Sequence, residues 1–109
     1  MKKLALATLA LLPLCALAED WSNVALIDAG CKNKVKDTDA HPTQCLIKCA
    51  GSGYGVVAAD GKWTALDKKG SELALAALQS TKKTDHIRVN VSGELKGDTI
   101  AVTKLAIVE

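Results

Sequence analysis

Aromatic side chains are scarce in this sequence of 109 residues, which contains two Trp, one Tyr and no Phe. Surfaces that bind nucleic-acid bases or sugar rings by stacking depend on such side chains. The composition therefore argues against a base-stacking platform and against an aromatic-lined sugar site. It also requires a hydrophobic core built mainly from Val, Ile, Leu and Ala.

The longest uncharged apolar stretch lies at the N-terminus and is short for a membrane helix. Residues 4–18 carry no charge, two lysines precede them, and acidic residues follow. Such a pattern is typical of a secretory signal, whereas a membrane-spanning helix needs about 20 apolar residues. The small side chains of Ala16 and Ala18 predict cleavage after Ala18. We therefore expect residues 1–18 to be a cleavable signal peptide and residues 19–109 to form a single periplasmic or secreted domain.

An excess of charge of either sign is also missing. The chain has 14 Lys and Arg against 12 Asp and Glu, and loss of Lys2 and Lys3 with the signal leaves 12 of each. This balance gives no reason to expect a nucleic acid, or a membrane surface for the mature form, as the partner. A periplasmic protein or a glycan is the partner class that we consider for this domain.

Apolar periodicity and turn residues predict five short strands and two helices. The strands are expected at residues 21–29, 54–59, 62–66, 86–92 and 98–108, a short helix at 43–50, and a longer helix at 70–81. Ser71 is the expected cap of the longer helix, and residues 93–97 are expected to form a turn. Five strands with a helix between the third and the fourth are typical of an OB-type barrel. The sequence thus predicts a mainly β, five-stranded OB-like barrel, with an open α+β sheet as the alternative.

The last predicted strand changes its pattern part-way along. Ile100 and Val102 share one face, whereas Leu105 and Ile107 have the opposite parity. One extra residue between the two pairs would restore both to the same side of the strand. We therefore expect a β-bulge near residues 103–104.

Three cysteines and a histidine form the one group of residues whose chemistry points to a site. Cys45 and Cys49 are four residues apart in the predicted short helix, so they share a face. His41 lies just before that helix, and Cys31 follows the first strand. We expect these four side chains to converge.

A metal site is one interpretation of this group. Three thiolates and one imidazole suffice for tetrahedral zinc, and soft thiolates also suit copper(I). The ligands would be Cys31, His41, Cys45 and Cys49, with Asp28 as a partner that orients one of them. The odd number of cysteines favours this interpretation, because a disulfide leaves one thiol unpaired.

A disulfide is the competing interpretation. Exported proteins mature in an oxidising compartment, so Cys31 is expected to pair with Cys45 or Cys49. Closing a loop of this length would add roughly 3 kcal/mol to stability. Direct pairing of Cys45 with Cys49 is disfavoured by helix geometry. A thiol redox protein built on the remaining cysteine is the third interpretation, although the sequence has no C-x-x-C pair.

Several motifs together resemble a group of small exported bacterial proteins of unknown function. They comprise Leu26-Ile27-Asp28-x-x-Cys31, His41-x-x-x-Cys45-x-x-x-Cys49-Ala50, Gly53-Tyr54-Gly55-Val56-Val57, Val89-x-Val91-x-Gly93 and Gly97-Asp98-Thr99-Ile100-x-Val102. The resemblance implies an OB-like fold with a Cys/His cluster after the first strand, and it implies no activity. The sequence therefore favours a non-enzymatic exported module that binds zinc or copper, with a disulfide-stapled interaction module as the alternative.

Overall fold

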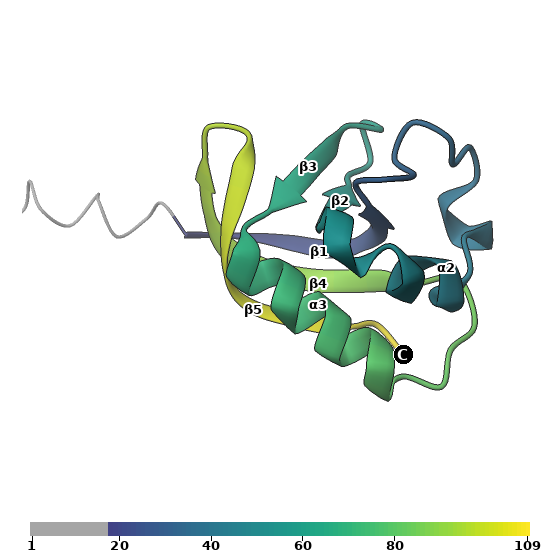
Figure 1. The fold of residues 1–109 in the computed structure, drawn as a ribbon. Coiled ribbons are helices and arrows are strands. Elements are labelled where there is room, and N and C mark those ends of the chain that lie inside the picture. Colours follow the sequence, from purple (N-terminus) through teal and green to yellow (C-terminus); the bar gives the residue numbers. More distant parts are fainter. Residues whose placement is uncertain (1–17) are drawn as a thin grey trace, which may run out of the picture.

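A computed structural model describes residues 18–109 (Figure 1). Apart from Ala18, the predicted signal peptide lies outside the described residues. In chain order the elements are β1 (Ala18–Asp28), η2 (Thr38–Ala40), α2 (Thr43–Lys48), η3 (Ala50–Ser52), β2 (Tyr54–Val57), β3 (Trp63–Leu66), α3 (Lys68–Ser80), β4 (Arg88–Lys96) and β5 (Thr99–Ile107). No helix in this part of the chain is long and apolar enough to cross a membrane.

The five strands close into a barrel in the order β1-β2-β3-β5-β4. Strand β1 pairs antiparallel with both β2 and β4, and only the short contact between β3 and β5 is parallel. Helix α3 connects β3 to β4 and packs against β5 (Figure 1). The predicted OB-like barrel is therefore confirmed, and the open α+β sheet is not the architecture.

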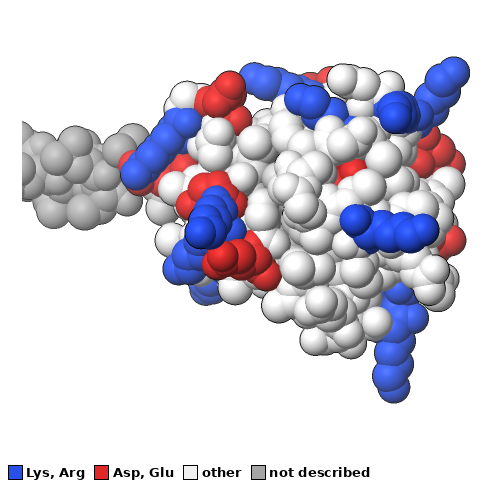
Figure 2. Space-filling view, viewed as in Figure 1, with Lys and Arg blue, Asp and Glu red and all other residues white. Residues whose placement is uncertain are grey.

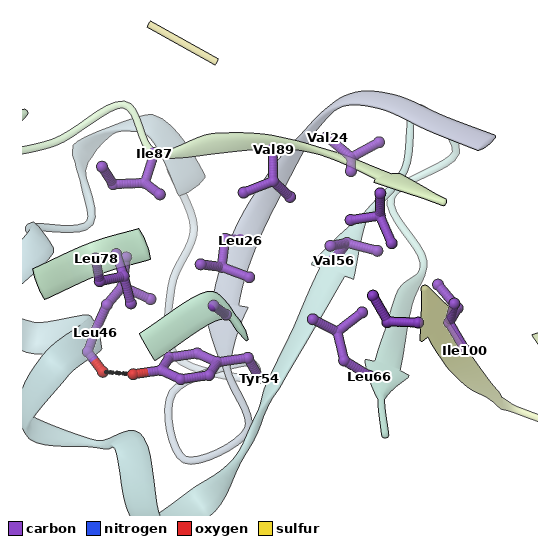
Figure 3. Close-up of a cluster of buried hydrophobic side chains, with 13 residues drawn as sticks. Val24, Leu26, Leu46, Tyr54, Val56, Leu66, Leu78, Ile87, Val89 and Ile100 are labelled. Atoms are coloured by element: carbon purple, nitrogen blue, oxygen red, sulfur yellow. Dashed lines mark hydrogen bonds between the residues drawn. The ribbon is translucent and has the colours of Figure 1, made fainter. Parts of the chain in front are cut away.

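Aliphatic side chains fill the barrel, as the shortage of aromatics requires. Every second residue in the first part of β4 points inward, so Val89 and Val91 are buried together with Ile87 just before the strand. Figure 3 shows Ile87 and Val89 facing Leu26 of β1 and Val56 of β2. The rest of the core cluster consists of Val24, Leu46, Tyr54, Leu66, Ala74, Leu78, Ile100 and Val102.

The predicted bulge is present in β5. Ser92 pairs with Lys104 and Gly93 with Val102, so Thr103 is the extra residue. The turn predicted at residues 93–97 is wrong, because β4 continues to Lys96. Gly93 lies within β4, and only glycine fits there because a Cβ would lie 2.3 Å from the carbonyl oxygen of Ala101. The chain reverses only after Lys96.

The cap predicted for the second helix is also wrong. Helix α3 begins at Lys68, and its N-cap is Asp67, whose side chain accepts a hydrogen bond from the Gly70 amide. Ser71 instead accepts a hydrogen bond from the Tyr54 amide at 3.0 Å. Because Asp67 caps the helix, the Ser71 hydroxyl is available to connect α3 to the start of β2.

Other predicted boundaries also differ from the structure. Helix α2 ends at Lys48 because η3 follows, β2 ends at Val57, and β4 begins at Arg88 rather than at residue 86. His86 has a positive φ of 54° and is exposed just before β4.

Figure 2 shows acidic and basic side chains interspersed over the face that is seen in Figure 1.

Candidate metal centre

Strand β1 ends in a buried carboxylate. Asp28 is 0% exposed and pairs in register with Tyr54 at the start of β2. One residue earlier, the Ile27 carbonyl accepts a hydrogen bond from the Trp63 indole N–H at 3.1 Å. Pairing with β2 and this indole contact therefore fix the end of the strand and the direction in which the Asp28 side chain leaves it.

A tight turn brings Cys31 back toward Asp28. The Cys31 amide donates to the Asp28 carbonyl oxygen at 3.2 Å. Within the turn, the Gly30 amide donates to Ser52 Oγ at 3.1 Å, and Ser52 Oγ in turn donates to the Cys49 carbonyl oxygen at 2.7 Å. The two segments that carry Cys31 and Cys49 are thus held side by side by one serine hydroxyl.

Helix α2 carries Cys49 at its C-terminal end. Leu46 of this helix is fully buried, and its carbonyl oxygen accepts a 2.7 Å hydrogen bond from the Tyr54 hydroxyl (Figure 3). At the other end, the Thr43 hydroxyl donates to the Lys83 carbonyl oxygen at 2.7 Å. With both ends attached to the barrel and to the segment after α3, the helix fixes the position of Cys49.

The consequence of these contacts is a cluster of three metal-ligating side chains. A carboxylate oxygen of Asp28 and the sulfur atoms of Cys31 and Cys49 all lie within 4.8 Å of one another. Around a tetrahedral zinc ion, with bonds of about 2.0–2.3 Å, ligand atoms are separated by roughly 3.6 Å. Small side-chain rotations of the half-exposed cysteines would therefore bring all three donors to one ion.

The two oxygens of Asp28 differ in their partners. Oδ1 accepts a hydrogen bond from His41 Nε2 at 2.9 Å. Oδ2 is buried and has no hydrogen-bond partner among the described residues. A buried polar atom without a partner costs about 1–3 kcal/mol, and more when the group is charged. Binding of a cation at Oδ2 would remove this cost.

The carboxylate also acts on the neighbouring thiol. The negative side chain of Asp28 is the main cause of a raised pKa at the Cys31 thiol, and burial and Cys49 act in the same direction. Burial, with smaller contributions from Asp28 and Cys49, raises the pKa of Tyr54 to about 12. Burial is thus the main cause of the raised pKa at Tyr54, and the neighbouring carboxylate is the main cause at Cys31.

The structure assembles a different subset of residues from the one the sequence suggested. Asp28, expected to orient a ligand, belongs to the donor group itself, whereas His41 contacts Asp28 and lies outside that group. Cys45 is exposed on α2 and is also outside it. None of the three described cysteines forms a disulfide.

Two contributors to the site were missed in the sequence. Ser52 connects the segments of Cys31 and Cys49, and Trp63 fixes the end of β1 and places its ring 4.3 Å from Lys32 Nζ. Neither residue belongs to a motif. An aspartate at the end of an apolar strand, three residues before a cysteine, was the one signal in the sequence that pointed to the donor role of Asp28.

Comparisons with protein-family models, with curated proteins and with solved structures found no match for this chain. The class of this protein is therefore described by its fold and its side-chain cluster alone. It is a small closed β-barrel with a possible Asp/Cys/Cys metal-binding group after its first strand.

Proposed function

We propose that this protein is an exported, non-enzymatic module that binds one zinc or copper ion through Asp28, Cys31 and Cys49. The observation that carries the proposal is the buried Asp28 carboxylate. Its Oδ2 has no hydrogen-bond partner among the described residues, and one of its oxygens lies within 4.8 Å of the sulfurs of Cys31 and Cys49. Buried polar atoms without a partner are rare in native proteins, and a bound ion can fill the place of the missing partner. The basic and apolar pattern of residues 1–18 supports export.

The donor set favours zinc over copper. Zinc accepts thiolate, imidazole and carboxylate ligands, whereas copper(I) prefers thiolate and thioether sulfur. Two sulfurs with a buried carboxylate oxygen are thus better matched to zinc.

His41 supports the site through Asp28 in this proposal. Its Nε2–H donates to Oδ1, which leaves Oδ2 available to a bound ion. A hydrogen bond behind a ligating group fixes the orientation of that group, and loss of such a partner typically weakens metal affinity 10–100-fold. His41 is therefore a positioning residue.

The test compares three single substitutions in reduced protein. Cys31→Ser and Cys49→Ser each remove one donor and are expected to abolish stoichiometric zinc binding in a competition with a chromophoric chelator. Cys45→Ser is the matched control, because Cys45 is exposed and outside the donor group, and it is expected to keep full affinity. Loss of binding in all three variants would show that the ligand set is wrong, and full binding in all three would refute the proposal.

A second candidate function is supported by the nearness of the two cysteines. If Cys31 and Cys49 are permanently oxidised, the cluster acts as a staple and the barrel serves to bind a periplasmic protein or a glycan. Mass spectrometry of the protein purified from the export compartment, with and without thiol alkylation, separates the two functions. A chain that lacks two hydrogen atoms and holds no metal after reduction supports the staple. A reduced pair with a retained ion supports the metal site.

A further inference from the structure

We propose that Cys31 and Cys49 form a reversible thiol–disulfide switch, in which the reduced pair binds the metal and the oxidised pair excludes it. This inference rests on the proposed metal-binding function and describes its regulation. It differs from a permanent staple because one chain passes between two states that exclude each other.

Proximity is the first argument for the switch. The two sulfur atoms lie within 4.8 Å of each other, and a disulfide requires a separation of about 2.05 Å. Both side chains are half-exposed and neither belongs to the buried core. Each can therefore rotate until the two sulfur atoms meet. The hydrogen bonds through Ser52 keep their backbones side by side in either state.

Shared atoms make the two states exclusive. The metal and the disulfide both require the sulfur atoms of Cys31 and Cys49, and a disulfide sulfur no longer carries the negative charge of a thiolate ligand. Oxidation would remove two of the three donors in the group and leave Asp28 with its His41 partner. A single carboxylate does not form a tetrahedral zinc site.

The reaction needs a disulfide as oxidant. One cysteine thiolate attacks a small external disulfide such as oxidised glutathione, which breaks the external S–S bond and releases one thiol. The second cysteine sulfur then displaces the other external thiol from the mixed disulfide. The protein loses two electrons, and the external disulfide gains them as two thiols. When the metal-loaded pair reacts, the same exchange releases two external thiolates and the free cation.

Cys45 is the competing partner and is disfavoured by its position. It precedes Cys49 by one helical turn, and the Cys49 amide donates to the Cys45 carbonyl oxygen at 3.2 Å. Two cysteines separated in this way along a helix are poorly oriented for a disulfide. The exposed thiol of Cys45 is therefore expected to form only mixed disulfides with external thiols.

The experiment uses the full chain with Cys45→Ser and with Cys15→Ala in the predicted signal peptide, so that Cys31 and Cys49 are the only remaining cysteines. The protein is equilibrated in reduced or oxidised glutathione. Intact mass then reports the disulfide, and a chromophoric chelator reports bound zinc. We expect one zinc ion per reduced chain. In oxidised glutathione we expect a mass loss of two hydrogen atoms with at least tenfold weaker zinc binding, and full recovery after reduction.

The possible failures are distinguishable. A reduced chain that binds no zinc overturns the proposed function, and the switch with it. A reduced chain that binds zinc, but whose cysteines yield only glutathione adducts, overturns the switch alone. An oxidised chain that has the disulfide and still holds zinc at full affinity also overturns the switch, but not the proposed metal-binding function. Cys49→Ser in the same background is the control, because it has no partner for Cys31 and should give a glutathione adduct only.

Discussion

Asp28 and Asp67 occupy equivalent local positions in two regions of the barrel. Each ends an apolar strand segment, Leu26-Ile27-Asp28 in β1 and Ala65-Leu66-Asp67 after β3. The backbone carbonyl of each accepts a hydrogen bond from the segment that follows, from the Cys31 amide in the turn after β1 and from the Ser71 amide in α3. The difference lies three residues further on, where the first region has Cys31 and the second has Gly70.

This difference determines how the two carboxylates are used. Asp67 Oδ1 accepts the amides of Gly70 at 2.8 Å and of Val102 at 3.3 Å, so it caps α3 and connects that helix to β5. Asp28 accepts one hydrogen bond from His41, its other oxygen has no hydrogen-bond partner in the described part of the chain, and the carboxylate lies close to two cysteine sulfurs. A carboxylate that accepts hydrogen bonds from backbone amides stabilises the fold. A carboxylate that lies beside thiols, with an oxygen that lacks a hydrogen-bond partner among the described residues, can instead bind a metal ion.

The sharpest test of this contrast is the same substitution in both regions. Asp28→Asn removes the negative charge and an acceptor oxygen, and we expect zinc affinity to fall by at least about 100-fold, equivalent to roughly 2.7 kcal/mol. Asp67→Asn should leave affinity unchanged, because Asn is also a preferred N-cap residue. Chelator competition measures both. Equal effects in the two variants would contradict the assigned roles.

Loss of His41 should have a smaller effect than loss of Asp28. His41→Ala removes the hydrogen bond that orients the carboxylate, and the expected decrease in zinc affinity is about 10–100-fold. His86→Ala is the control, because His86 is exposed and contacts Asp85 rather than the site. A loss of zinc affinity in His41→Ala larger than that in Asp28→Asn would contradict the positioning role and indicate that His41 is itself a ligand.

Tyr54 links the two regions and gives the smallest predicted effect. Its amide donates to Ser71 of α3, and its hydroxyl donates to Leu46 of α2. Tyr54→Phe removes the second bond and should lower the free energy of unfolding by about 1 kcal/mol near neutral pH. The change is modest because the ring remains buried.

The same residue predicts a pH dependence whose sign follows from its pKa. The folded pKa of about 12 exceeds the ordinary value of 10.0, so the unfolded chain loses the phenolic proton first. This contribution to stability is complete below about pH 10 and is lost as the pH rises toward about 12. Urea unfolding over that range should show a decline that is smaller in Tyr54→Phe. Identical slopes for both proteins would contradict burial of the hydroxyl.

The sequence predicted the barrel because its signals are periodic and local. Alternation in β4 identified the inward side chains, and the parity change between Val102 and Leu105 located the bulge at Thr103. The boundary of α3 was missed because Asp67 and Ser71 are both good caps, and only the position of β5 beside Asp67 decides between them.

The site was harder to predict because it depends on the rotation of one short helix. Thr43 and Leu46 face the interior, and this orientation leaves Cys45 exposed. Spacing alone placed Cys45 and Cys49 on one face, but Cys49 lies beyond the last residue of α2 as its C-cap. The role of Asp28 depends on tertiary contacts with Cys31 and Cys49, which periodicity does not report.

X-ray absorption spectroscopy of the zinc-loaded, reduced protein tests the central claim most directly. The ligand set of Asp28, Cys31 and Cys49 predicts two sulfur ligands at about 2.3 Å, with lighter oxygen or nitrogen atoms completing the shell. Three sulfur ligands would mean that Cys45 joins the site. A shell without sulfur would place the ion elsewhere and contradict the account.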